Sequence, residues 1–556
     1  MKGPALPEAM LHLQVPDGAQ SIGYRLRIGV TGHRKLPNSP ALTDAIAGAV
    51  QRIKALVPRS EVTPVRLAVV SALAEGADRL VARIVLQEPE AHLEAVLPMP
   101  AEDYESDFIT PASLHEFREL LACAARVVEL PAMPTREEAY EEGGEYVVER
   151  CDVLIALWDG KPAHGLGGTA DIVAWARDHE TPVFWVHTQA PFATREWLGS
   201  GLNLDAFDQI DRYNKASANS RQLTAEIART AADLSRRAER AGIQHDAMQP
   251  FLAWIVPDYV RADLLARTAQ RRFLQTSDAT FVFAAMAVVA SAGPDLAEHG
   301  SLLSHLSLPA SVRLAPLLEC AMMGLVLLII YLGRRLELHR RWLSYRFLAE
   351  RLRSALYLAL ASGHERAERT PELVTLHQPA EAWLQRAFDE IWVSRPVAAK
   401  PIAVEALRAF FVDEWVGDQR LYQAKKSRRH AKAHRIVQWV SVAVFFATLC
   451  MAAIDAGLAS DQALGGTGTT LVTYLSIILP ALAGAVGGIG ALREHPRNAH
   501  RSNHMVHSLA RIEHRMKRAA DLATLRVLAR QAEAMMLEES GDWFVTMQFR
   551  DVEVSG

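Results

Sequence analysis

Three short glycine-containing segments hold the residue types that bind phosphate groups in proteins. They are Gly29-Val-Thr-Gly-His-Arg34, Ser71 to Asp78, and Gly165-Leu-Gly-Gly-Thr-Ala-Asp171. Glycine lets the backbone approach a ligand closely, and the free N–H groups at the start of a helix attract anions. Hydroxyl and guanidinium groups in the same segments add further donors. Together the segments predict a site for a small molecule that carries phosphate.

The candidate contacts to that ligand come from all three segments and from one further strand end. Arg34 and Arg79 would supply positive charge, and Asp171 would hold a ribose hydroxyl. Simpler interpretations stay open: each segment alone also fits a glycine-capped turn, His33 and Asp159 fit structural roles, and Asp171 suits the first turn of a helix. The candidate binding residues are Gly29, Thr31, Gly32, His33, Arg34, Ser71, Glu75, Gly76, Asp78, Arg79, Asp159, Gly165, Gly167, Gly168, Thr169 and Asp171.

The elements that must position these residues alternate between strand and helix patterns. Alternation of largely apolar strands with helices predicts an α/β, Rossmann-like domain whose parallel sheet is covered on both faces. In such sheets ligands bind beyond the carboxyl ends of the strands, which is where the three segments fall. The predicted strands are Arg25–Val30, Val65–Val70, Leu93–Leu97, Val127–Leu130, Asp152–Trp158 and Thr181–Val186.

The same segments carry a resemblance to a known superfamily. Arg27-Ile-Gly-Val-Thr-Gly-His-Arg34, Val69-Val-Ser-Ala-Leu-Ala-Glu-Gly-Ala-Asp78 and Gly165-Leu-Gly-Gly-Thr169 resemble the SLOG superfamily of Rossmann-like nucleotide-binding domains. Leu97-Pro-Met-Pro-Ala-Glu-Asp-Tyr104 and Asp152 to Gly160 resemble bacterial SLOG sensors that are fused to membrane segments. The resemblance implies a nucleotide-derived ligand (a cyclic nucleotide, or a molecule related to ADP-ribose or NAD) and no tightly bound cofactor.

One departure from that superfamily bears on catalysis. The lonely-guy phosphoribohydrolases carry a PGGxGTxxE loop whose Glu takes part in cleaving a glycosidic bond. Here Gly168-Thr169 is kept, but Ile172 stands where the Glu would be, and Asp171 is the nearest acid. A general acid or base must reach the reacting atom within hydrogen-bond distance, and an Ile side chain has no such group. We therefore predict no catalytic residue.

The composition of the chain excludes several classes of function. The chain has 556 residues and a net charge of −4, which suits several domains and gives no bulk basic surface for nucleic acid. Cys123, Cys151, Cys320 and Cys450 form no ligand-spaced pair, so we predict neither a metal site nor a disulfide framework. Residues 1–20 lack a basic segment followed by an apolar core, so we expect the first domain to stay in the cytoplasm.

Two uncharged runs near the C-terminus predict a membrane hairpin. Ile436–Ile454 and Leu471–Leu492 are each close to the roughly 20 apolar residues that cross a bilayer. Lys and Arg flank both outer ends, from Lys425 to Arg435 and at Arg493, Arg497 and Arg501, and are absent from the connection. By the positive-inside rule the connection is exported and both outer ends are cytoplasmic. A buried helical hairpin, the alternative, would not require this asymmetry of charge.

An earlier segment repeats the same order of basic, apolar, mixed, apolar and basic residues. Its predicted spans are 277–294 and 314–333, and Arg334 and Arg335 follow the second. The first span is the weaker one, with a buried helix as the alternative. Asp278 would cost about 2.5–3.5 kcal/mol at a membrane centre, so we place it at the cytoplasmic boundary. Both pairs of spans are followed by long helical segments, Trp342–Leu360 and Met505–Met536.

These helical segments carry a second resemblance. Trp342-Leu-Ser-Tyr-Arg-Phe-Leu-Ala-Glu-Arg-Leu-Arg353 and Trp415 to Tyr422 look like SLATT domains, two-helix membrane modules found with SLOG partners in bacterial defence systems. The predicted domains are a nucleotide-binding domain (1–207), a helical connector (208–263), a first two-span module (264–380) and a second (381–556, spans 436–454 and 471–492). The resemblance implies a membrane effector that a nucleotide messenger switches on in antiviral defence and that forms a pore or disrupts the membrane in another way.

Four residues within the spans have chemistry that suits a membrane. Glu319 lies about one turn from the exported end of its span, where an acid either faces a bundle interior or extends to the interface. Gly484 and Gly488 suit close helix contact, within one chain or between chains. Pro480 predicts a kink. These residues and the two hairpins predict a lipid partner and a multi-pass homo-oligomer with both termini cytoplasmic, and the resemblance to SLATT domains implies that the membrane is the bacterial inner membrane.

Two other functions remain as alternatives. The first is a membrane-tethered nucleotide or NAD-type hydrolase in which Asp171 replaces the missing Glu. The second is a nucleotide-binding scaffold that assembles partners at the membrane. Turnover of nucleotides would favour the hydrolase, whereas saturable binding without turnover would favour the sensor.

Overall fold

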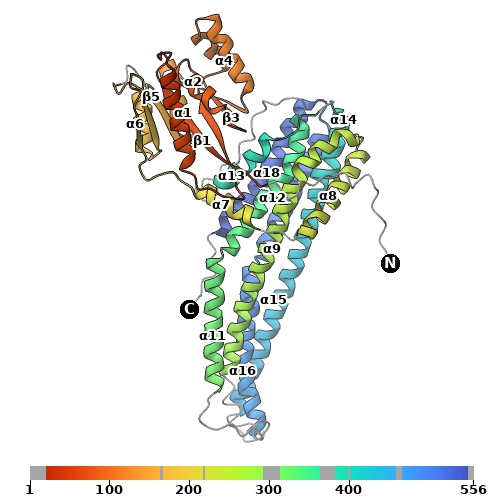
Figure 1. Cartoon of the computed structure of the whole chain (residues 1–556). Helices are drawn as coiled ribbons and strands as arrows, with labels where there is room; N and C mark the ends of the chain where they lie inside the picture. The colour runs from red at the N-terminus through yellow and green to blue at the C-terminus, as the bar shows by residue number, and fades with distance from the viewer. Residues whose placement is uncertain are drawn as a thin grey trace. The chain divides into compact units, whose positions relative to one another are not determined.

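The computed structural model describes residues 21–162, 167–216, 220–291, 314–362, 382–398, 401–458 and 466–548 (Figure 1). The chain forms two compact units that alternate along the sequence. The first comprises Met1–Ser235, Gln244–Asp258 and Leu358–Ile402, and the second comprises Arg236–Ile243, Tyr259–Tyr357 and Ala403–Gly556. The chain thus leaves the first unit and returns to it twice.

The first unit contains the predicted α/β sheet. Within the described residues the sheet has seven strands in the order β4-β3-β2-β1-β5-β6-β7. The first six are parallel, and β7, a short polar edge strand that the sequence pattern missed, is antiparallel to β6. The strands are β1 Tyr24–Gly32, β2 Val65–Ser71, β3 His92–Leu97, β4 Arg126–Glu129, β5 Val153–Trp158, β6 Val183–His187 and β7 Thr194–Trp197.

Helices connect the first six strands of this sheet or follow the sheet along the chain, and several have a clear start signal. Pro40 opens one at its first position, and the hydroxyls of Thr110 and Thr135 accept backbone N–H bonds at the starts of two others. The helices are α1 Pro40–Ala55, α2 Ala77–Val85, α3 Ala101–Tyr104, α4 Pro111–Cys123, α5 Arg136–Arg150, α6 Thr169–Asp178, α7 Asp205–Lys215, α8 Ser220–Arg240 and α13 Ala382–Val393.

The strand order creates a switch point between β1 and β5. From β1 the chain moves outward through β2, β3 and β4, and it then returns to place β5 on the other side of β1. Residues Tyr24 to Val30 of β1 and Val153 to Leu157 of β5 are buried, as expected for the centre of a sheet covered on both faces. A crevice opens where neighbouring loops run in opposite directions, and this is where such sheets bind ligands.

The second unit is helical and holds four stretches long and apolar enough to cross a membrane, among the described residues. They lie within His245–Ser291, Leu317–Ser362, Val404–Ile454 and Tyr474–Lys517. Each stretch overlaps one predicted span, although residues 314–316 and 471–473 of those spans lie before the stretches begin and residues 292–294 fall outside the described residues. The helices are α9 His245–Ser291, α11 Leu314–Arg335, α12 Leu338–Ser362, α14 Val404–Ala409, the π-helical η4 Phe410–Gly417, α15 Asp418–Leu458, α16 Gly466–Leu492, α17 His495–Lys517 and α18 Leu522–Gln548.

The helices α9, α11, α15 and α16 run side by side (Figure 1), and large apolar side chains on them are exposed. Leu327 is 63%, Trp439 74% and Phe445 70% exposed. Such a surface is unfavourable in water and suits contact with lipid. The fold class predicted from the sequence is therefore confirmed, and the four long apolar helices are consistent with a multi-pass membrane protein.

The polar and small residues of the spans take distinct positions. A Cβ on Gly488 would collide with the ring of Phe281 in α9, whereas Gly484 faces open space. Pro480 lies inside α16, which continues through it. Glu319 is partly exposed on α11. Asp278 forms an ion pair with Arg493 at 2.6 Å; because Arg493 directly follows the last apolar run, this pair suits the membrane boundary expected for Asp278.

Candidate functional site

A cavity of about 450 Å³ lies at the carboxyl ends of β1 and β5. Its volume falls in the range of small-molecule sites, roughly 300–1,000 Å³, and its position is the switch point of the sheet. The predicted residues that line it are Thr31, Gly32, His33, Arg34, Asp78, Asp159, Gly167, Gly168 and Thr169. Gly165 lies outside the described residues. Gly29, Ser71, Glu75, Gly76, Arg79 and Asp171 do not line the cavity, and binding by any of these residues stays a prediction.

Two buried charges fix the loop between β2 and α2. The Asp78 carboxylate accepts a hydrogen bond from the Ser71 hydroxyl at 3.0 Å and bonds from the backbone of Ala72 and Ala74. Arg79 donates to the Leu73 carbonyl at 3.0 Å, and its guanidinium lies 4.5 Å from the centre of the Phe108 ring. Both side chains are more than 90% buried. They shape the loop whose Ala72 and Ala74 line the cavity.

Arg79 and Glu75 also join this loop to α4. Arg79 donates to the carbonyl and hydroxyl oxygens of Ser113, at 2.9 and 3.0 Å, and the Ser113 hydroxyl donates to the Glu75 carboxylate. The positive charge of Arg79 is thus directed away from the cavity. Its role in the structure is to hold the loop.

Two glycines with positive φ bring loops together at the rim. Gly76 has φ +82°, and a Cβ there would collide with the carbonyls of Arg34 and His33. Gly167 has φ +72°, and a Cβ there would lie 2.6 Å from the backbone nitrogen of Glu141. Glycine adopts this backbone region without steric cost. The two positions therefore let the loops after β1 and β2, and the start of α6, approach their neighbours closely.

The start of α6 presents backbone donors to the cavity. Gly168 is the N-cap residue, with no side-chain capping bond, and its carbonyl accepts from the N–H groups of Asp171 and Ile172. The N–H groups of Thr169 and Ala170, which also line the cavity, have no acceptor within the described part of the chain. A helix start with free N–H groups favours an anion.

His33 links the loops that follow β1 and β5. Its backbone N–H donates to Leu157 at 3.0 Å, and its Nε2 accepts from the backbone N–H of Asp159 at 3.1 Å. The Asp159 carboxylate accepts from the backbone of Lys161 and lies 3.1 Å from His33 Nε2, and together these contacts lower the pKa of Asp159 to about 2. At neutral pH, Asp159 is an ionised group at the edge of the cavity.

The cavity also has two exposed cations. The side chains of Arg34 and Lys161 are 46% and 68% exposed. Arg34 lies 3.6 Å from the Asp107 carboxylate and stands over the Tyr140 ring at 5.3 Å, and Lys161 lies 3.3 Å from Asp159. Their carboxylate partners Asp107 and Asp159 are only 8% and 17% exposed, but the cations themselves lie in solvent, which screens each pair. Both cations can therefore turn toward a bound anion.

One wall of the cavity is apolar or aromatic, and the sequence analysis did not single it out. It is formed by Pro98, Tyr104, Tyr140, Gly143, Gly144, Val147, Trp158 and Ile172. The side chain of Ile172 packs where a Cβ on Gly144 would lie. Two adjacent glycines inside a helix cost roughly 1 kcal/mol each relative to alanine, and this cost was the signal in the sequence that could have identified α5 as part of the site.

The acidic groups do not form a hydrolytic arrangement like that of the lonely-guy enzymes. Asp171 is exposed and outside the cavity lining, while Ile172 is 3% exposed and forms part of the wall. The acids in the lining are Asp78 and Asp159. Burial raises the pKa of Asp78 to about 6, but its oxygens are already bonded within the loop. Asp171, the acid that would replace the missing Glu, is therefore not among the described residues that line the cavity.

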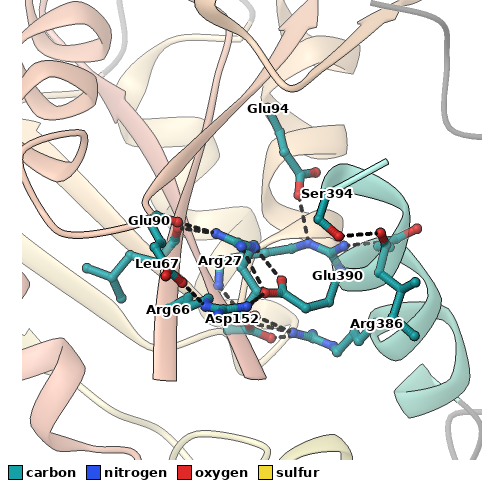
Figure 2. Close-up of polar contacts among 12 residues, drawn as sticks. Arg27, Arg66, Leu67, Glu90, Glu94, Asp152, Arg386, Glu390 and Ser394 are labelled. Atoms are coloured by element: carbon teal, nitrogen blue, oxygen red, sulfur yellow. Dashed lines mark hydrogen bonds and ion pairs between the residues drawn. The ribbon is translucent and has the colours of Figure 1, made fainter. Parts of the chain in front are cut away.

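At the opposite, amino edge of the sheet, a buried network of charges holds α13. Figure 2 shows Arg386 and Glu390 reaching from α13 toward the starts of the strands. Arg25 binds Glu390 through two hydrogen bonds of 2.7 and 3.0 Å, and Arg27 donates to Asp389 at 2.8 Å. The network pairs four arginines with four carboxylates: Arg25, Arg27, Arg66 and Arg386 with Glu94, Asp152, Asp389 and Glu390.

The network joins the two central strands to α13. Arg386 donates to both oxygens of Asp152, at 2.8 and 2.5 Å, and Asp152 directly precedes β5. The backbone N–H of Arg27 in β1 donates to the same carboxylate at 2.8 Å. Burial opposes ionisation of Glu94, but Arg27 and two neighbouring arginines lower its pKa to about 2. The sequence analysis missed the contacts of α13 because their partners in the sheet lie more than 230 positions away along the chain.

Metal binding and disulfide formation have no support in the described residues. No group of three His, Cys, Asp or Glu side chains there is arranged to hold a metal ion, and Cys123, Cys151, Cys320 and Cys450 are unpaired. No protein-family model and no curated protein matches the chain. Its function must therefore be argued from the cavity and the helices themselves.

Proposed function

We propose that this chain is a membrane effector controlled by a nucleotide-derived ligand, which binds the cavity at the carboxyl ends of β1 and β5. The observation that carries the proposal is that one cavity combines groups that can bind phosphate with an apolar and aromatic wall. The start of α6, Arg34 and Lys161 suit phosphate, while Tyr140, Val147 and Ile172 suit an aromatic base. The exposed apolar helices provide the membrane part.

The route from ligand to membrane would run through β1, β5 and α13. Both strands contribute to the cavity at their carboxyl ends and to the α13 network at their amino ends. Arg27 and Thr31 are four residues apart on β1, or about 13 Å. Along the chain, α13 lies between the second and third predicted spans. A ligand that binds two arrangements of these strands unequally would shift α13, and with it the segments that lead into the spans.

Bacterial defence, with the membrane becoming permeable on ligand binding, is the setting that the SLOG and SLATT resemblances support. In that setting the protein would be a homo-oligomer in the inner membrane with both termini in the cytoplasm. The hydrolase alternative has less support, because Asp171 lies outside the cavity lining.

Binding and activity can be measured on the purified full chain. The ligand would be sought by mass spectrometry of small molecules that co-purify, and its binding would be measured by calorimetry against cyclic nucleotides, ADP-ribose and NAD. Dye release from liposomes would then be followed with and without that ligand. Saturable binding with ligand-dependent release is expected. Release of a free base would favour the hydrolase, and absence of binding would contradict the proposal.

Gly168→Asp is the single substitution that most directly tests phosphate binding at the start of α6. Gly168 has φ −68° and ψ 160°, which an aspartate adopts without strain, and Asp is a preferred N-cap residue. We therefore expect the variant to fold. Its carboxylate would occupy the α6 donors and repel phosphate, so we expect affinity to fall at least about a hundredfold, or roughly 2.7 kcal/mol, and liposome release to be lost.

The matched control is Gly48→Asp. Gly48 lies in α1, and a Cβ there would meet nothing within 4 Å. The control adds the same charge to the same unit and should bind ligand like the wild type. If Gly168→Asp retains wild-type affinity and release, the start of α6 is not the phosphate site.

A further inference from the structure

One face of α15 carries a row of positive charges that continues into exposed apolar side chains. Lys425, Arg428, Lys432 and Arg435, here called the cationic stripe, are spaced by three, four and three residues and are all exposed. Residues at this spacing lie on one face of a helix. The same spacing continues through Trp439, Val442 and Phe446, which are 74%, 59% and 64% exposed.

The opposite face of α15 packs against α17. Gln423 is 4% exposed, the Ser427 hydroxyl donates to the Ala499 carbonyl at 2.9 Å, and His430 lies 2.9 Å from His495 between their Nδ1 atoms. Burial and the neighbouring cations lower the pKa of His430 to about 4, so it is neutral at pH 7. The packing thus directs the four charges of the stripe away from the helical bundle.

The cations of the stripe have no carboxylate partner within the residues that the structure describes. This distinguishes them from nearby cations: Arg420 pairs with Glu513 at 2.7 Å, and Arg493 pairs with Asp278 at 2.6 Å. Four unpaired charges on one helix face repel each other, and an anionic partner would relieve that repulsion.

We propose that the cationic stripe binds anionic phospholipid headgroups of the cytoplasmic leaflet. The partner is a lipid because the stripe is continuous with the lipid-facing apolar face of the same helix. The stripe rises about 15 Å along the helix from Lys425 to Arg435. Lys432 and Arg435 fall within the headgroup layer, roughly 5–8 Å thick, and Lys425 and Arg428 lie within about one Debye length of it, roughly 8–10 Å.

This binding would make the membrane part of the effector sensitive to lipid charge. The stripe lies on the segment that enters the third predicted span, and Trp439 marks the expected depth of the interface. Charge at the membrane surface would fix the depth and rotation of α15. The inference does not depend on the nucleotide site and can be tested without any nucleotide.

The test uses the purified full chain in vesicles of equal parts phosphatidylglycerol and phosphatidylcholine with identical acyl chains. The protein is extracted in a neutral detergent, and the lipid retained is measured by mass spectrometry. Because one basic residue near an anionic surface contributes roughly a fivefold factor, we expect wild-type protein to retain phosphatidylglycerol over phosphatidylcholine by at least about tenfold. In Arg428→Gln/Lys432→Gln/Arg435→Gln this preference should fall at least about fivefold.

The matched control is Arg271→Gln/Arg272→Gln/Arg335→Gln, which removes three exposed charges from α9 and α11. Because the stripe is intact in this control, it should lose clearly less of the preference than the stripe variant. The charge-conserving variant Lys425→Arg/Arg428→Lys/Lys432→Arg/Arg435→Lys should retain the preference. Equal losses in the two triple variants would mean diffuse attraction to the membrane surface, and an unchanged preference in the stripe variant would mean no binding by it. Either result overturns the proposal.

A measurement on the wild type alone covers the case in which the stripe variant fails to insert. Its preference for phosphatidylglycerol should disappear at about 0.5 M salt, where exposed charges are screened. If the preference is unchanged at that salt concentration, headgroup charge is not what the protein recognises, and the proposal is wrong.

Discussion

At the scale of single residues, charged side chains in this protein divide into those that shape the site and those that face it. Arg79 and Asp78 are buried and hold the loop after β2 through bonds within it and to α4, whereas Arg34 and Lys161 are exposed at the rim of the cavity. Only exposed groups in weak pairs can change partner at low cost. Arg34 and Lys161 are therefore the side chains that we expect a bound phosphate to recruit.

Glu94 gives a prediction about pH. Its pKa in the folded protein is lowered to about 2, so its contribution to stability is fully present above its usual pKa of about 4.5 and is lost as pH falls toward 2. Glu94→Gln removes that contribution, roughly 1–3 kcal/mol. We expect the variant to have a lower thermal midpoint than wild type at pH 7, and the difference to narrow between pH 4.5 and 2.

Intrinsic fluorescence of the full chain in detergent would report these midpoints. Glu105→Gln serves as the control, because Glu105 forms an exposed pair with Arg118 on the surface of the same unit. It should leave the midpoint nearly unchanged. Equal midpoints for Glu94→Gln and wild type at pH 7 would show that the ionised Glu94 does not stabilise the fold.

At the scale of elements, α13 is the helix whose role most depends on its partners. It carries Arg386, Asp389 and Glu390 to the amino edge of the sheet, where the charges are buried. Removing one member of a buried pair typically costs 3–5 kcal/mol because the other charge stays desolvated. The network therefore makes the attachment of α13 sensitive to small shifts of β1 and β5.

A double-mutant cycle on Asp152 and Arg386 tests that attachment. Arg386→Gln should destabilise the protein by about 3–5 kcal/mol, and Asp152→Asn/Arg386→Gln should recover part of the loss, with a coupling of about 0.5–3 kcal/mol. Under the proposed function, the single variant should still bind ligand but lose ligand-dependent release from liposomes. Denaturant unfolding, calorimetry and dye release measure the three effects.

Arg118→Gln is the matched control for this cycle, since it makes the same substitution in an exposed pair of the same unit. It should leave stability, binding and release close to wild type. If Asp152 and Arg386 act additively, the pair is not coupled. If Arg386→Gln releases dye like wild type, α13 is not the transmitting element.

At the scale of the whole chain, the charge pattern predicts how the protein is oriented in the membrane. Basic residues flank the outer ends of both pairs of spans, so both connections should be exported and both termini cytoplasmic. In a Cys320→Ala/Cys450→Ala background, Asp461→Cys should react with a membrane-impermeant maleimide on intact cells. Without Asp461→Cys, that background should react only after permeabilisation, through the exposed Cys123. Protection of the cysteine at position 461 in intact cells would contradict this topology.

Much of the fold could be predicted from patterns in consecutive residues. Alternating apolar strands and helices predicted the parallel sheet, and uncharged runs of span length predicted the membrane helices, because both signals lie in consecutive residues. The site was predicted in part: Thr31, Gly32, Arg34 and Gly168 line the cavity. The wall formed by α5 was missed, because the facing side chains come from helices whose packing on the sheet is not a local property.

The sequence alone determined which segments form strands, which can cross a membrane and where positive charge gathers. The tertiary structure decided what each charge does. It buried Arg79 beneath a loop, paired Arg386 with Asp152 across 234 positions and turned the cationic stripe of α15 away from α17. The reason is physical: residue type fixes that a side chain is charged, but only its distant neighbours decide whether that charge is buried and paired or exposed and free to bind.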